Sequence, residues 1–124
     1  MKINSIILGL TALLIFLVLT GCKASPDTDS DATITFKGCY VDEQDRDLDG
    51  YSFDSEEMTN TLCIKICQEQ GFKYAATEYS NECYCGNTYG KYGIADADEC
   101  NEPCAGDPES ICGGYWTESV YQIK

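Results

Sequence analysis

Residues 45–56 carry carboxylates at the spacing of a calcium-binding loop. Four side chains fall on the acidic positions of the EF-hand pattern: Asp45, Asp47, Asp49 and Glu56. Carboxylate oxygens are ligands that Ca²⁺ prefers, and Gly50 stands where such a loop turns sharply. Ser52 replaces the usual aliphatic residue, however, and the stretch before the loop reads as strand rather than helix. We interpret this segment, the acidic loop, as an acidic surface loop and keep weak calcium binding as an alternative.

Other carboxylate pairs could act as general acid and base. Glu78 and Glu82, for example, could form the pair that a glycosidase uses. With 21 acidic residues in the chain, however, neighbouring carboxylates arise by chance. The chain has no histidine, which removes the commonest general base, and serines such as Ser119 have no basic partner. We therefore expect no enzymatic activity and no cofactor.

Aromatic side chains crowd the second half of the chain. Flat rings stack on the apolar faces of sugars, while amide and carboxylate groups bond their hydroxyls. Six residues form the candidate carbohydrate-binding set: Tyr79, Asn87, Tyr89, Tyr92, Tyr115 and Trp116. The alternative is that tyrosines fill a small core, and we expect this for Tyr40, Tyr74 and Tyr121. We expect Tyr89, Tyr92 and Trp116 to be exposed, and Tyr84 fits either the core or the opposite sheet face.

Length and charge limit the partners of the protein. The 124 residues suit one domain, and 8 basic against 21 acidic residues give a net charge of −13. This charge cannot neutralise a run of phosphates, which argues against nucleic acid and against docking on anionic lipid. A neutral polysaccharide or other glycan remains open, and we expect a monomer.

Nine cysteines in so short a chain indicate an exported disulfide scaffold with one cysteine left over. The N-terminus accounts for the odd one. Lys2 and an apolar run from Ile6 to Val18 are typical of a signal peptide, here residues 1–21. The run ends in Leu19-Thr20-Gly21-Cys22, which resembles the lipobox of bacterial lipoproteins and implies lipidation of Cys22. Residues 22–36 then form a flexible acidic linker.

The remaining eight cysteines lie in residues 37–124, and four of them have matching spacings. Thr59 caps a predicted helix that ends before Gly71, with Cys63 and Cys67 about 6 Å apart along it. Cys83 and Cys85 share one face of a predicted strand about 6.7 Å apart. Two parallel disulfides could join helix and strand in either register. Zinc ligation by these four cysteines is the weaker alternative.

A series of short motifs runs through the domain in a fixed order: Gly38-Cys39-Tyr40, Arg46-x-Leu48, Ser55-x-x-Met58-Thr59, Cys63-x3-Cys67, Gly71-Phe72-x-Tyr74-Ala75, Glu78-Tyr79-x-x-Glu82-Cys83-Tyr84-Cys85-Gly86-Asn87, Cys100-Asn101-x-Pro103-Cys104-Ala105-Gly106, Cys112-Gly113-Gly114 and Ser119-Val120-Tyr121. Over residues 37–122 this order resembles the WSC family, named for fungal cell-wall stress sensors; Ala76 departs from its frequent glycine. The resemblance implies a small disulfide-rich α+β fold of the PAN/apple type, with one helix packed on an antiparallel sheet. It also implies four bridges, 39–100, 63–83, 67–85 and 104–112, and carbohydrate binding.

These features together predict a lipid-anchored, non-enzymatic protein that binds cell-wall or extracellular polysaccharide. The anchor would lie in the cell membrane, or in the outer membrane of a Gram-negative cell, with the domain facing the periplasm or the cell surface. A protein-binding adhesion or receptor module and a calcium-dependent module are the alternatives.

Overall fold

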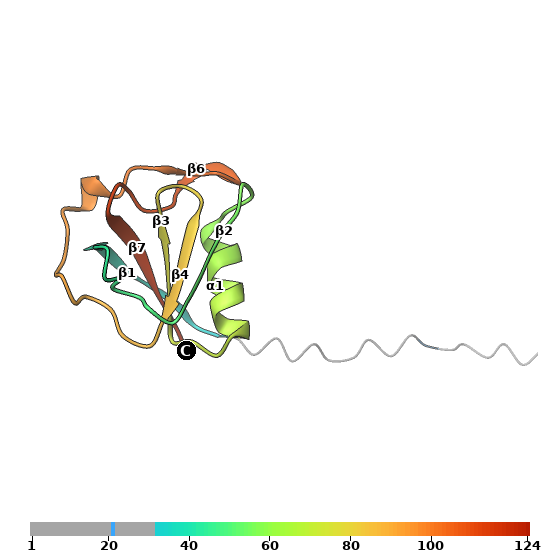
Figure 1. The fold of residues 1–124 in the computed structure, drawn as a ribbon. Helices are drawn as coiled ribbons and strands as arrows, with labels where there is room; N and C mark the ends of the chain where they lie inside the picture. The colour runs from blue at the N-terminus through green and yellow to red at the C-terminus, as the bar shows by residue number, and fades with distance from the viewer. Residues whose placement is uncertain (1–20, 22–31) are drawn as a thin grey trace, which may run out of the picture.

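A computed structural model describes Gly21 and residues 32–124. Five strands form an antiparallel sheet in the order β1-β7-β3-β4-β2, and a short β5–β6 hairpin forms a second sheet. The helix α1 lies along one side of the large sheet (Figure 1). The elements are β1 (Ile34–Val41), β2 (Tyr51–Asp54), α1 (Asn60–Glu69), β3 (Tyr74–Glu78), β4 (Glu82–Gly86), the 3₁₀ helix η1 (Ala97–Glu99), β5 (Pro103–Cys104), β6 (Asp107–Ile111) and β7 (Thr117–Ile123). The predicted α+β class is confirmed.

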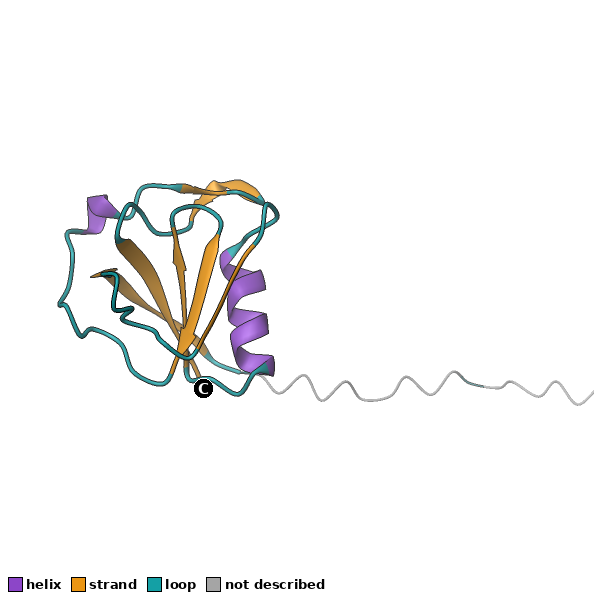
Figure 2. Cartoon of the chain, viewed as in Figure 1, coloured by secondary structure: helices purple, strands orange, loops and turns teal. Residues whose placement is uncertain are grey.

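Figure 2 shows α1 between two loop segments, and local sequence signals account for both of its ends. Thr59 is its N-cap, and Thr59 Oγ1 accepts a hydrogen bond from the Leu62 N–H at 3.0 Å. Such a bond satisfies one of the backbone donors that a helix start leaves free. Gly71 follows the C-cap residue with φ of +83°, a left-handed conformation that glycine adopts without strain. Both predicted helix boundaries are confirmed.

Four disulfides join the elements in the predicted pairing. Cys63–Cys83 and Cys67–Cys85 fasten α1 to β4, and the structure selects this register of the two that spacing allows. Cys39–Cys100 ties β1 to the segment after η1, and Cys104–Cys112 closes the small hairpin. Two bridges therefore hold the helix on the sheet, and two hold the segments between β4 and β7.

The sheet has a core on each face. In the core that includes the helix face, six of the eight bridged cysteines pack with Met58 and Ala75, and partly buried apolar side chains from α1, β2, β7 and the turn after α1 pack against them. On the opposite face, Leu48, Ala76, Tyr84 and Val120 are buried, with Tyr40, Tyr74 and Tyr89 packed against them. Since side chains alternate along a strand, Tyr84 points away from the two cysteines beside it, and it is buried in this second core. Tyr121, also expected in the core, is half-buried on β7 and packs against Phe36.

The sheet starts earlier than the sequence predicts. Ile34 already pairs with Ile123, so β1 begins inside the segment assigned to the linker, which was expected to run to residue 36. Cys22 and residues 1–20 of the predicted signal peptide lie outside the described residues. Within the described part of the chain, no helix is both long and apolar enough to cross a membrane.

Candidate functional site

Three exposed aromatic rings gather at one end of the sheet and form what we call the aromatic patch. Tyr79, Tyr115 and Trp116 are 51%, 70% and 38% exposed. The ring centroids of Tyr79 and Tyr115 lie 6.0 Å apart, and those of Tyr115 and Trp116 lie 6.4 Å apart. A hydrogen bond of 3.2 Å from the Tyr79 N–H to the Gly114 carbonyl holds the two turns together. The predicted exposure of Trp116 is confirmed.

The backbone that presents these rings is strained. Tyr79 and Trp116 adopt φ values of +48° and +54°, in the left-handed region that residues other than glycine seldom occupy. Such conformations persist where the surrounding structure holds them and are frequent at binding sites. The chain reversals therefore turn two large rings outward rather than into a core.

A cavity of about 210 Å³ opens beside the aromatic patch. Its polar lining comes from Arg46, Glu78 and Glu82, and its aromatic lining is the patch itself. The Arg46 guanidinium carbon stands 4.6 Å from the ring centre of Tyr84 and 5.0 Å from that of Trp116. Ring faces, a guanidinium and two carboxyl groups at one shallow opening can both stack on a ligand and bond its hydroxyl groups.

The other three candidate carbohydrate-binding residues do not join the patch. Tyr89 packs against Tyr40 and Tyr74, with ring centroids 5.0 and 4.7 Å apart, and is half-buried where exposure was expected. Tyr92 is also half-buried, and its hydroxyl donates to the Asp45 carbonyl. Asn87 is exposed and accepts a hydrogen bond from the Lys73 N–H at 3.2 Å. The predicted set thus divides into one surface cluster and one group that supports the loop after β4.

The acidic loop does not fold as an EF-hand. Its second half contains β2, and the carboxylate oxygens of the four predicted ligands do not converge, as judged over residues 32–124. Asp47 is buried and accepts hydrogen bonds from the N–H groups of Gly90 and Lys91 at 2.6 and 2.7 Å. Asp45 instead pairs with the Lys91 ammonium at 3.1 Å. These residues fasten two loops over the second core.

A buried group of carboxyl side chains lies behind the cavity, which we call the acid cluster: Asp42, Glu78 and Glu118. Burial, followed by the proximity of Asp42, raises the pKa of Glu78 to about 9. Burial, followed by Asp47 and Asp42, raises the pKa of Glu118 to about 10. Sequence reasoning considered Glu78 only as a partner of Glu82. Glu118 was missed because acidic side chains are seldom buried, although it stands two positions before Val120 and therefore on the same face of β7.

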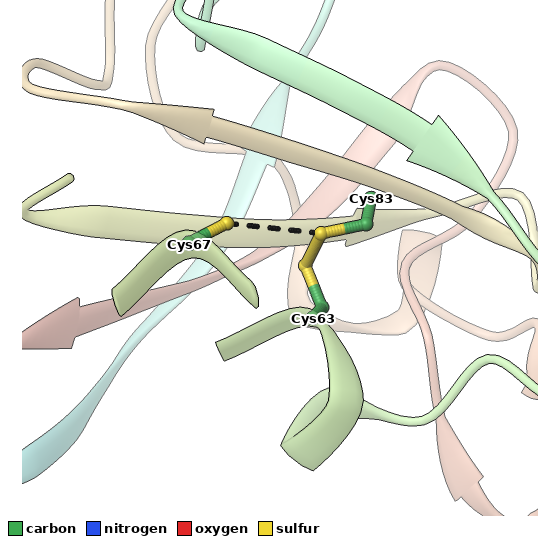
Figure 3. A group of neighbouring side chains, drawn as sticks. All are labelled: Cys63, Cys67 and Cys83. Atoms are coloured by element: carbon green, nitrogen blue, oxygen red, sulfur yellow. Dashed lines mark hydrogen bonds between the residues drawn. A yellow bond between two sulfur atoms is a disulfide. The ribbon is translucent and has the colours of Figure 1, made fainter. Parts of the chain in front are cut away.

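The sulfur atoms that suggested a zinc site are engaged in disulfides. Figure 3 shows the Cys63–Cys83 bridge, with the Cys67 sulfur 3.8 Å from that of Cys83. Cys67 is itself bonded to Cys85. Zinc binds the thiolate, so bridged cysteines cannot ligate it. The weaker zinc alternative is therefore wrong for this structure.

Comparison with known proteins matches the same part of the chain. A family model described as the WSC domain covers residues 36–114. Xylosyltransferase oxt of Drosophila pseudoobscura pseudoobscura is 38% identical over 88 residues, which are 68% of this chain and 10% of that protein. A WSC domain-containing protein of Arthroderma benhamiae is 38% identical over 90 residues, 71% of this chain and 12% of its own length. Kremen protein 1 of Homo sapiens is 44% identical over 80 residues, 62% of this chain and 17% of its own length. The chain thus spans less than a fifth of the length of these curated relatives.

Proposed function

The chain belongs to the WSC domain family, and from this premise we propose that it is a carbohydrate-binding module without enzymatic activity. Its ligand is a cell-wall or extracellular polysaccharide, and the aromatic patch is the surface that binds it. The match to this family covers one domain of much longer relatives. It therefore supports a binding-module role for this chain and not the whole activity of any relative.

One observation carries the proposal: three exposed aromatic rings surround a shallow cavity with charged side chains at its wall. Exposed large rings cost solvation free energy and are usually retained where a partner covers them. Three aromatic rings line this cavity, whereas the cavities beside β1 and β2 are each lined by two. Tyr115 is the most exposed of the three rings.

The proposed mechanism is stacking with hydrogen bonding, and no bond is made or broken. The rings of Tyr79 and Tyr115 cover the apolar face of a sugar, and Glu82 and Arg46 reach its hydroxyl groups. The net charge of −13 disfavours anionic polymers, so a neutral polysaccharide is the expected ligand class. Because the cavity is shallow, each sugar contributes little, and binding along a polymer adds contacts.

We further propose that lipid on Cys22 holds the domain at a membrane, with the acidic segment after it as a tether. The apolar run followed by Leu19-Thr20-Gly21-Cys22 supports this assignment. In a bacterial host, Cys22→Ser should leave the protein unprocessed or released from the membrane fraction. Normal anchoring of the variant would contradict the assignment.

Glycan binding can be tested with the full chain in detergent micelles on an array of neutral and charged polysaccharides. Tyr115→Ala should weaken binding by about 5- to 30-fold, corresponding to a loss of about 1–2 kcal/mol. Phe36→Ala is the matched control, because Phe36 is also an exposed ring, 58% accessible, but lies on β1 outside the cavity. If no polysaccharide binds, and a protein partner is recovered whose binding Tyr115→Ala removes, the adhesion-module alternative replaces this proposal.

A further inference from the structure

The register of the large sheet places acidic side chains directly opposite one another. Glu118 on β7 pairs with Glu78 on β3, and Glu78 pairs with Glu82 on β4. Directly opposed residues point to the same face and bring their side chains together, and like charges there destabilise a sheet. Such a row of carboxylates therefore requires something that offsets its charge.

Three carboxyl groups converge at the centre of this arrangement. One oxygen from each member of the acid cluster lies within 4.8 Å of one from each of the others. Asp42, Glu78 and Glu118 are only 2%, 3% and 0% exposed. Asp42 directly follows β1, Glu78 ends β3, and Glu118 is the second residue of β7, and these three strands are neighbours in the sheet. The cluster is therefore built on three adjacent, hydrogen-bonded strands.

Existing partners satisfy only part of the cluster. Arg46 Nη1 contacts Asp42 Oδ2 at 2.5 Å and Glu78 Oε1 at 3.4 Å, and the Asp47 N–H donates to Asp42 Oδ1 at 2.7 Å. Among the described residues, Glu78 Oε2 and both carboxyl oxygens of Glu118 receive no hydrogen bond from an N–H or hydroxyl group. The remaining hydrogen-bond contact of these two residues is a proton shared between carboxyl groups, Glu78 with Asp42 and Glu118 with Asp47. A fully buried carboxyl group that only other carboxyl groups face is a costly arrangement unless a ligand completes it.

The net charge of the acid cluster and Arg46 indicates the charge of the missing ligand. A bound cation displaces the protons that the raised pKa values keep on Glu78 and Glu118 in the metal-free protein. The three ionised carboxylates and the one Arg46 guanidinium then sum to −2, which is the charge that one divalent cation offsets. Asp47 stands behind Glu118, and its two oxygens are already engaged by the backbone N–H groups of Gly90 and Lys91. We propose that the acid cluster is a binding site for one hard divalent cation, with Ca²⁺ as its best match, held by the free oxygens of Glu118 and Glu78 and by Asp42.

The chemistry of the site selects this class of cation. All the available ligands are carboxylate oxygens, which suit Ca²⁺, Mg²⁺ and Mn²⁺ rather than softer metals. Two oxygens that bind one Ca²⁺ ion can be up to about 4.6–5.2 Å apart, so oxygens that all lie within 4.8 Å of one another can share the ion. Mg²⁺ requires shorter bonds and keeps several waters, for which a site with completely buried ligands leaves little room. Glu78 also lines the cavity beside the aromatic patch, and this gives the cation a route from solvent.

The test is a titration of the full chain, freed of metal with EDTA, first with Ca²⁺ alone and then with Mg²⁺ alone. Calorimetry should show one Ca²⁺ per chain, at least tenfold tighter than Mg²⁺. Glu118→Gln, which keeps the shape and removes the charge, should weaken Ca²⁺ binding by at least tenfold. The matched control is Glu56→Gln in the acidic loop, an exposed carboxylate that should leave the affinity unchanged.

Terbium luminescence is a second measurement of binding, for the case that Glu118→Gln folds poorly. Tb³⁺, which replaces Ca²⁺ in oxygen sites, should emit when Trp116 is excited, because that ring stands 5.0 Å from the guanidinium that contacts the cluster. Glu78→Gln should reduce this emission, and excess Ca²⁺ should quench it. Absence of Ca²⁺ heat in the wild-type chain would refute the proposal. So would equal binding by wild type and Glu118→Gln, or a loss of binding in Glu56→Gln alone, which would assign the ion to the acidic loop.

Discussion

Replacing Glu118 by glutamine should flatten the dependence of the unfolding free energy on pH. Burial, and after it the nearby Asp47, Asp42 and Glu78, raises the pKa of Glu118 in the folded protein to about 10, against 4.5 for an unperturbed glutamate. In metal-free solution the folded state therefore keeps a proton that the unfolded chain releases. Stability contributed by this protonated group is present below pH 4.5 and is lost progressively as the pH rises through 10.

The magnitude follows from proton linkage. One retained proton changes the unfolding free energy by about 1.4 kcal/mol per pH unit, so Glu118 alone costs about 2.7 kcal/mol between pH 6 and pH 8. Glu78, whose pKa is raised to about 9 by burial and by Asp42, acts in the same direction and remains in the variant. Three other charged groups face the cluster, namely Arg46, Asp47 and Glu82. They are present in both the wild type and Glu118→Gln, so they do not contribute to the difference between the two pH dependences. The variant should therefore lose about 2.7 kcal/mol less than the wild type over this range.

Urea unfolding of the full chain, with its disulfides intact and EDTA present, measures this difference at pH 6, 7 and 8. Fluorescence of Trp116, the only tryptophan, reports the transition. Glu56→Gln, an exposed carboxylate on the acidic loop, controls for the general effect of removing one negative charge from an acidic protein. Wild-type stability that is level from pH 6 to 8, or an equal slope in wild type and Glu118→Gln, would refute the reasoning.

Two further predictions concern the scaffold and are measured by the same urea unfolding at pH 6. Replacing both cysteines of Cys39–Cys100 by serine should cost about 4 kcal/mol, and replacing both of Cys104–Cys112 about 2.5 kcal/mol, because their separations of 61 and 8 residues constrain the unfolded chain differently; the reverse order would contradict this explanation. Gly113→Ala should cost about 3 kcal/mol or more, because φ is +67° and an added Cβ would stand 2.3 Å from the Thr77 carbonyl oxygen. Gly71→Ala, with φ of +83° but open space around it, should cost only about 1 kcal/mol, and equal losses would show that the close contact does not matter.

Local features of the fold were predictable because their causes are local. The Thr59 cap and the glycine after α1 act within a few residues, and both were read correctly from the sequence. The matched spacings of Cys63 with Cys67 and of Cys83 with Cys85 follow from the rise per residue of helix and strand. Spacing left two registers open, and the resemblance to the WSC family supplied the one that the structure contains.

The aromatic residues were predictable as a class but not one by one. Tyr89 and Tyr115 both lie in polar, glycine-containing segments, and the sequence gives no reason to separate them. The loop after β4 folds back over the second core and buries one side of Tyr89 against Tyr40, whereas the turn before β7 directs Tyr115 to solvent. Loop paths of this kind depend on distant contacts, here the anchoring of Gly90 and Lys91 by Asp47.

The sequence by itself determined the class of the protein: an acidic, histidine-free chain with a disulfide-bonded domain that contains eight cysteines. It also indicated one capped helix and several aromatic residues in polar loop segments. Only the tertiary structure decided which side chains meet. Glu78 and Glu118 are 40 positions apart, and a shift of one residue in the pairing of β3 with β7 would turn one of them to the other face. The aromatic patch and the acid cluster both depend on that register, and it is set by packing across the whole sheet rather than by the residues near either site.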